Sequence, residues 1–90
     1  MELTFTKDGD KYVAQFTATS DFNIHIEKSG GRIVLFQSSV ENGEYDYVSG
    51  ATIAESDGVF DSDFTALIYP KYIKMVADST PRVAVVTFAE

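Results

Sequence analysis

Hydrophobic and polar residues alternate with a period of two along nearly the whole chain, and no apolar stripe of helical spacing is sustained. The clearest example is the segment 22–27, in which one Phe and two Ile alternate with Asn, His and Glu. Turn-forming residues such as Asp8-Gly9 and 56–58 interrupt the alternation at intervals of about eight to twelve residues. The pattern predicts many short strands that are half buried.

We expect about eight antiparallel strands in a β-sandwich of jelly-roll-like topology, forming a single domain over residues 1–90. An Ig-like sandwich and a closed barrel have a similar number of strands and fit the same pattern. The expected strands cover residues 2–6, 12–18, 22–27, 32–38, 45–53, 60–68, 72–77 and 82–88.

Two details of this pattern make specific predictions about pairing and faces. Residues 72–77 and 82–88 are expected to form a closing pair joined through residues 78–81. In the preceding strand, Phe60, Phe64, Ala66 and Ile68 are expected to share one face, with the acidic residues of that strand opposite. Pro70 is expected at a break or at the start of a strand, because it cannot donate to a ladder.

Two segments depart from simple alternation. Residues 33–36 and 83–88 are apolar on both faces of the strand, which indicates that both faces are covered. In an isolated sandwich one set of these side chains would face water. The candidates for contact with a partner are therefore Val34, Phe36, Val83 and Val85. Two central strands with chance surface valines are the alternative.

The net charge, the absence of cysteine and the first residues of the chain disfavour several classes of partner and site. Fourteen acidic and seven basic residues give a net charge of −7, which disfavours nucleic acid and anionic membrane as partners. The chain has no cysteine, so it has no disulfide, cysteine-based zinc site or thiol nucleophile. Its first residues have neither the basic start nor the apolar run of a signal peptide, so we expect synthesis and folding in the cytoplasm.

His25 is the single histidine and the first candidate for catalysis. It shares a strand face with Glu27, so it could act as a general base that this carboxylate orients. The alternative is an ordinary residue on a solvated face, and this interpretation is favoured because no Gly-x-Ser-x-Gly nucleophile motif accompanies the histidine. We therefore expect no enzymatic activity and no cofactor.

The acidic run over residues 55–63 is a candidate calcium site. Asp57, Asp61 and Asp63 could supply oxygen ligands around the turn at Gly58. The run lacks the spacing and the closing Glu of an EF-hand, and alternating carboxylates are also what the solvent face of a strand carries. The structural interpretation is favoured, and no metal ligand is assigned.

Four tyrosines near loops or strand ends are candidates for ligand contact. A tyrosine offers a flat ring and a hydroxyl, which suits both sugar stacking and protein interfaces. The alternative is that these rings plug the ends of the sandwich. The four residues are Tyr45, Tyr47, Tyr69 and Tyr72.

Two segments carry a resemblance to a known class of proteins. Residues 64–76, which read FTALIYPKYIKMV, look like the late strand pair of jelly-roll domains in phage virion and fibre proteins. Residues 33–39 (IVLFQSS) followed by Gly43-Glu44-Tyr45 are similar to a strand–loop–strand unit of the same proteins. Over most of its length the chain resembles the small β-sandwich structural proteins of crAss-like bacteriophages.

The resemblance implies a virion component without enzymatic activity, such as a capsid decoration protein or a head-fibre subunit. It implies assembly with other copies of the chain or with larger capsid proteins, and it transfers no functional residue. The alternative function is a small carbohydrate-binding module that uses exposed tyrosines with nearby Asp, Asn or Gln.

Overall fold

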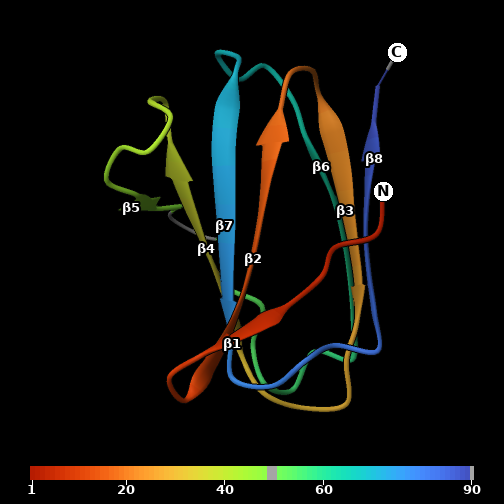
Figure 1. The fold of residues 1–90 in the computed structure, drawn as a ribbon. Coiled ribbons are helices and arrows are strands. Elements are labelled where there is room, and N and C mark those ends of the chain that lie inside the picture. The colour runs from red at the N-terminus through yellow and green to blue at the C-terminus, as the bar shows by residue number, and fades with distance from the viewer. Residues whose placement is uncertain (49–50, 90) are drawn as a thin grey trace.

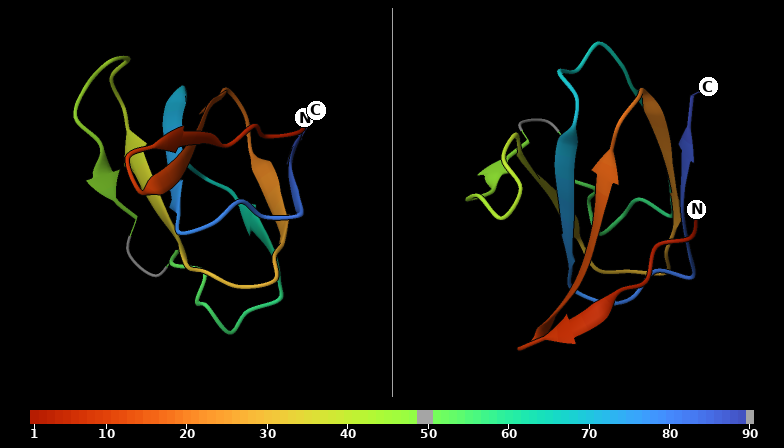
Figure 2. Two further views of the ribbon diagram at one scale, coloured as in Figure 1. Left: turned by 60° about the horizontal axis from the view of Figure 1, so that its bottom comes forward. Right: turned by 45° about the horizontal axis from the view of Figure 1, so that its top comes forward.

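The alternating residues place one face of each strand in an interior that two sheets share. In the computed structural model, which describes residues 1–48 and 51–89, both sheets are antiparallel and the described residues contain no helix. One sheet has the order β1-β2-β7-β4-β5, with β1 (Thr6–Asp8), β2 (Lys11–Ala18), β7 (Lys71–Ala77), β4 (Ile33–Ser38) and β5 (Asp46–Tyr47). The other has the order β6-β3-β8, with β6 (Val59–Phe64), β3 (Phe22–Glu27) and β8 (Val83–Phe88). The predicted all-β sandwich is confirmed, and Figure 2 shows its two layers.

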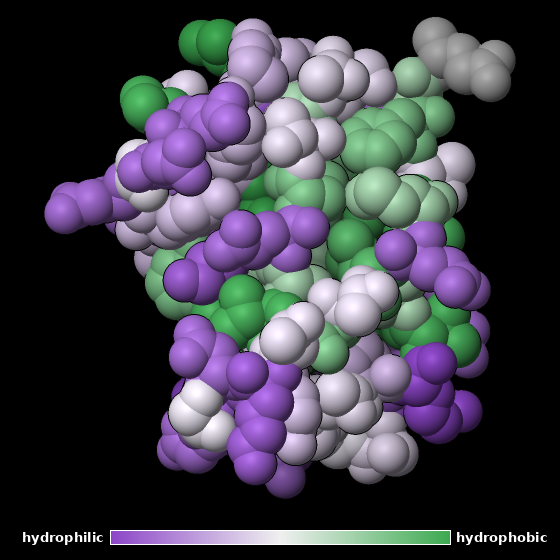
Figure 3. Space-filling model, viewed as in Figure 1, coloured by the Kyte–Doolittle hydropathy of each residue, from purple (hydrophilic) through white to green (hydrophobic). Residues whose placement is uncertain are grey.

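The N-terminal segment connects the free edges of the two sheets. Residues 1–3 run beside β8, where the Leu3 amide donates to the Ala84 carbonyl and the Val86 amide donates to the Met1 carbonyl. The chain then crosses to the other sheet, where β1 pairs with β2 (Figure 1). Figure 3 shows this side of the molecule with apolar side chains visible through its middle and hydrophilic residues to their left and right. The N-terminal segment thus closes part of an otherwise open side.

Strands that follow each other in the sequence mostly lie in opposite sheets. If residues 1–3 are counted as a strand beside β8, one layer has the order 1–3, β8, β3, β6 and the other has β1, β2, β7, β4, β5. From β2 to β4 and from β5 to β8, each successive strand lies in the opposite sheet. Most connections between consecutive strands therefore cross from one sheet to the other.

The predicted pairing of residues 72–77 with residues 82–88 is wrong, because β7 and β8 lie in different sheets. The connection between them pairs instead with the connection from β3 to β4, which spans the same two sheets. The Asp78 amide donates to the Arg32 carbonyl at 3.0 Å, and the Arg82 amide donates to the Glu27 carbonyl at 2.8 Å. Two crossing connections therefore support each other at one end of the sandwich.

Other strand boundaries also differ from the prediction. β6 ends at Phe64, because Ala66 adopts a left-handed backbone conformation with φ of 59°, and Ile68 is 82% exposed instead of sharing the inner face. β7 begins directly after Pro70, as predicted, and the peptide bond before Pro70 is cis. The expected strand 45–53 includes Ser49 and Gly50, which lie outside the described residues; on either side of them are β5 and Ile53, which pairs with Ile33.

The core is a single layer of side chains between the sheets. Its largest fully buried members come from both sheets and from the segment beside β4: Ile24, Ile26, Ile33, Leu35, Ile53, Met75 and Val86. Phenylalanines fill one end, where the Phe22 ring stacks on Phe64 at 5.0 Å between centroids and meets the edge of Phe16 at 5.4 Å. Each such burial contributes about 1.5–3 kcal/mol to folding.

Lys28 is a buried cation that holds the segment between β5 and β6. Only 4% of the residue is exposed, and its Nζ donates to the carbonyls of Ala54 at 2.6 Å and Glu55 at 3.2 Å. This segment supplies Ala51 and Ile53 to the core. Lys28 therefore holds in place the segment that covers the side of the sandwich opposite the N-terminal segment.

We expect Lys28→Met to lower the free energy of unfolding by about 1–3 kcal/mol, because two carbonyls lose a charged donor in a buried setting. Lys7→Met is the matched control, because Lys7 is exposed on β1, and its effect should stay within about 0.5 kcal/mol. Urea denaturation followed by circular dichroism measures both variants. Equal stability of the two variants would contradict the role assigned to Lys28.

The two crossing connections approach each other closely at Gly31, which also has a backbone conformation that favours glycine. Gly31 has a φ of +80°, and a Cβ atom at this position would lie 2.7 Å from the Ser79 hydroxyl. Its neighbour Gly30 has open space around the corresponding position. We expect Gly31→Ala to destabilise the fold by about 1–3 kcal/mol, and Gly30→Ala to change stability by less than about 0.5 kcal/mol. Thermal melting of the pair checks this difference, and similar melting temperatures would refute it.

Candidate functional site

The outer face of the five-stranded sheet carries an apolar row across its three central strands. Three rows of three residues from β2, β7 and β4 define this surface, which we call the five-stranded face: Val13, Val76 and Val34; Gln15, Lys74 and Phe36; Thr17, Tyr72 and Ser38. Val34 and Phe36 are half-buried there and lie outside the core cluster. The Phe36 ring meets the Tyr47 ring at 6.3 Å with nearly perpendicular planes.

The outer face of the three-stranded sheet is mixed acidic and apolar. Its rows, which define the three-stranded face, are Val59, Glu27 and Val83; Asp61, His25 and Val85; Asp63, Asn23 and Thr87. Val83 and Val85 are half-buried on β8, and Val59 is 63% exposed on β6. The four apolar residues proposed for partner contacts thus lie on outer faces, but as two pairs on opposite sides of the molecule.

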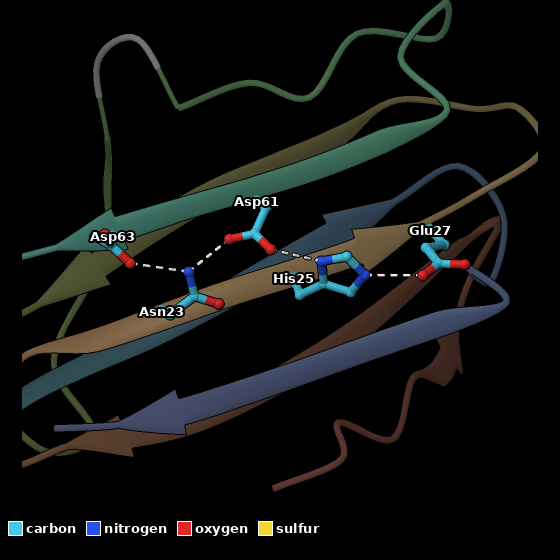
Figure 4. A network of polar contacts seen from close by, with 5 residues as sticks. All are labelled: Asn23, His25, Glu27, Asp61 and Asp63. Atoms are coloured by element: carbon cyan, nitrogen blue, oxygen red, sulfur yellow. Dashed lines mark hydrogen bonds and ion pairs between the residues drawn. The ribbon is translucent and has the colours of Figure 1, made fainter.

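A chain of polar contacts occupies the centre of the three-stranded face (Figure 4). His25 Nδ1 lies 2.8 Å from Asp61 Oδ2, and His25 Nε2 lies 2.8 Å from Glu27 Oε2. The Asn23 amide donates to Asp61 at 2.6 Å and to Asp63 at 2.9 Å. β3 supplies the histidine and the asparagine in register with the two aspartates of β6, so strand pairing alone builds the network.

The network favours the protonated histidine. Hydrogen bonds that the His25 ring donates to Glu27 first and to Asp61 second raise the pKa of His25 above its ordinary value of 6.5. Hydrogen bonds from Asn23 and His25 lower the pKa of Asp61. An imidazolium donates from both ring nitrogens, and here each nitrogen has a carboxylate oxygen to accept.

This geometry does not suit a general base at His25. A base needs a free nitrogen within reach of a nucleophile, and both ring nitrogens contact carboxylates instead. Glu27 does orient the ring, as expected from the shared face, but Asp61 takes the position at which a substrate proton would be accepted. The arrangement acts as an ion-paired surface network.

The three aspartates considered for calcium do not form one site. Asp57 accepts a hydrogen bond from the Ala54 amide at 3.0 Å and closes its own turn. Asp61 and Asp63 bind Asn23 and His25 on the three-stranded face. Within residues 1–48 and 51–89, no group of three His, Cys, Asp or Glu side chains is placed to hold a metal ion.

The four candidate tyrosines separate into three environments. The Tyr69 hydroxyl donates to Asp21 at 2.5 Å and its ring packs against the core, so it plugs an end of the sandwich. Tyr47 is 48% exposed, and its hydroxyl lies 2.8 Å from the Thr52 hydroxyl. Tyr45 and Tyr72 are the pair that the fold brings together, on the wall of one surface hollow.

The hollow has a volume of about 410 Å³ and lies where the connection from β4 to β5 meets β2 and β7. Besides the two tyrosines, its lining includes four polar residues that the sequence alone does not single out: Gln15, Thr17, Glu41 and Asn42. The only sequence signal for Gln15 and Thr17 is that they alternate with buried residues of β2. Their proximity to residues 41 and 42 depends on tertiary structure.

Comparisons with protein-family models, curated proteins and solved structures yield no match to this chain. The described part of the chain has no helix long and apolar enough to cross a bilayer. The two outer faces and the hollow are the features of the molecule that bear on its function.

The raised pKa of His25 gives a test of the network. The folded state holds the proton to higher pH than the unfolded state, so the network's contribution is complete below about pH 6.5 and is lost as pH rises through the folded pKa. We expect the urea concentration at the unfolding midpoint to decrease as the pH rises above about 6.5. His25→Gln should flatten this dependence, and Glu27→Gln should weaken it. A slope that persists unchanged in His25→Gln would show that another group causes it.

Proposed function

We propose that the domain is a non-enzymatic structural protein that assembles through contacts between its outer faces. The observation that carries the proposal is the position of the four candidate contact residues. Val34 and Phe36 lie on the five-stranded face, Val83 and Val85 lie on the three-stranded face, and none of them belongs to the core cluster. Apolar side chains on an outer face stay in contact with water unless another surface covers them.

The partner that we propose is another copy of the chain, with the five-stranded face of one copy against the three-stranded face of the next. Among the nine residues that define the five-stranded face, Lys74 is the only charged one. The three-stranded face carries Glu27, Asp61 and Asp63 around His25. Two three-stranded faces would oppose like charges, whereas the mixed contact brings a lysine to an acidic surface.

A contact between unlike faces leaves one free face at each end, so it can continue into a ring or an open chain. This property suits a repeated structural element. It agrees with the role that the resemblance implies, a virion component such as a capsid auxiliary protein or head-fibre subunit. The same face contacts would serve for docking on a larger capsid protein.

The test uses variants that block one face each. Val34→Asp places a carboxylate on the five-stranded face, and Val85→Asp adds one to the three-stranded face. Each variant alone should be monomeric by light scattering at high micromolar concentration, because every contact needs both faces. In an equimolar mixture, the intact three-stranded face of Val34→Asp can bind the intact five-stranded face of Val85→Asp. The remaining faces of this pair both carry the substitutions, so assembly should end at a dimer.

The control is Ile68→Asp, because Ile68 is 82% exposed and belongs to neither face. It should associate like the unmodified chain, and circular dichroism should show that all three variants fold. A strictly monomeric unmodified chain would refute self-assembly. Monomers in the mixture, or self-association of Val34→Asp alone, would refute the contact between unlike faces.

A further inference from the structure

The hollow beside Tyr45 and Tyr72 contains polar groups that the fold does not use. Within the described residues, none of the side chains of Gln15, Thr17, Glu41, Asn42, Tyr45 and Tyr72 forms a hydrogen bond with another described residue. The polar residues of the three-stranded face, in contrast, bind one another. The hollow therefore offers donors and acceptors that are free to bind a ligand.

The rim of the hollow is held in place by the turn that follows β4. Ser38 is buried, and its hydroxyl both donates to the Val40 carbonyl at 2.8 Å and accepts from the Val40 amide at 3.1 Å. The Gly43 amide donates to the same carbonyl at 3.0 Å. Across the gap, Lys71 binds the Ser39 hydroxyl at 2.8 Å and ties the turn to β7. These contacts position Glu41 and Asn42 over the outer face of β2 and β7.

The groups that line the hollow match a neutral, hydroxyl-rich ligand. The side-chain amides of Gln15 and Asn42 and the hydroxyl of Thr17 can each donate and accept hydrogen bonds, and the Glu41 carboxylate accepts them. Together these groups can bind ligand hydroxyls that act as donors or as acceptors. The tyrosines add flat apolar surface with a polar tip. Among the described residues that line the hollow, Glu41 is the only charged one, and its carboxylate repels anions such as phosphates.

We propose that this hollow is a saccharide-binding site in which Tyr45 and Tyr72 contact the sugar ring and Gln15, Asn42 and Glu41 bind its hydroxyls. Its volume of about 410 Å³ lies within the range of about 300–1,000 Å³ for small-molecule sites. Lys74 Nζ lies 5.6 Å from the centre of the Tyr45 ring and supports that ring from the sheet. The hollow shares Gln15, Thr17 and Tyr72 with the five-stranded face, so its binding is tested in a variant whose self-assembly is blocked.

The experiment applies the fluorescently labelled Val34→Asp protein to an array of immobilised glycans. The glycan that binds the protein most strongly is then titrated in solution while tyrosine fluorescence is recorded. We use Val34→Asp so that avidity from assembly does not contribute. We expect saturable binding to at least one glycan, weakened about tenfold or more by Tyr72→Ala and by Gln15→Ala. Tyr47→Ala is the matched control, because Tyr47 is an exposed tyrosine outside the hollow, and it should bind with unchanged affinity.

Tyr72→Phe and the melting curves of all variants separate loss of binding from loss of folding. Phe keeps the ring, so Tyr72→Phe should bind more tightly than Tyr72→Ala. Absence of binding to every glycan would overturn the proposal, as would binding that survives both Tyr72→Ala and Gln15→Ala or that Tyr47→Ala reduces equally. None of these results depends on whether the unmodified chain assembles, so failure here is distinguishable from failure of the assembly proposal.

Discussion

The interior between two packed sheets accepts only every second side chain of each strand, and the rest of the structure follows from this constraint. Ile24 and Ile26 on β3 and Leu35 and Met75 on the opposite sheet fill that layer. A shift of one residue in any strand would exchange its inner and outer side chains. The described residues form no helix that could cover an outer face, and the turn after β4 lies over part of one of the two faces. The apolar residues left outside by this register are therefore available for contacts with other molecules.

The inner faces of the strands were predictable because burial repeats with the period of the pleat. The alternation in residues 22–27 indicates both the strand and its buried side, and the structure agrees with both. The assignment of strands to sheets was not predictable in the same way. Residues 78–81 contain turn formers that suit a hairpin and a crossing connection equally well, and the choice depends on contacts with Arg32 and Glu27, which lie far away in the sequence.

In the candidate sites, too, contacts within one strand could be predicted from the sequence, whereas contacts between elements could not. Residues that share one strand, such as His25 and Glu27, could be placed on a common face from the sequence, and they contact each other. Asp61 and Asn23 join them only because β6 pairs with β3 in one particular register. Predicting the hollow from the sequence would require still more information, since β2, β7 and a loop must meet to bring Gln15 and Asn42 together. A buried lysine such as Lys28 has no sequence pattern that reveals it, because its partners are backbone carbonyls.

We propose that the outer valines of both sheets serve contact surfaces and not the fold of the single chain. The most direct measurement is a methyl NMR spectrum recorded during dilution from high to low micromolar concentration. We expect the methyl signals of Val34, Val76, Val83 and Val85 to shift together as copies separate, while those of the buried Ile24 and Val86 stay constant. Outer valine signals that do not change with concentration would contradict the claim.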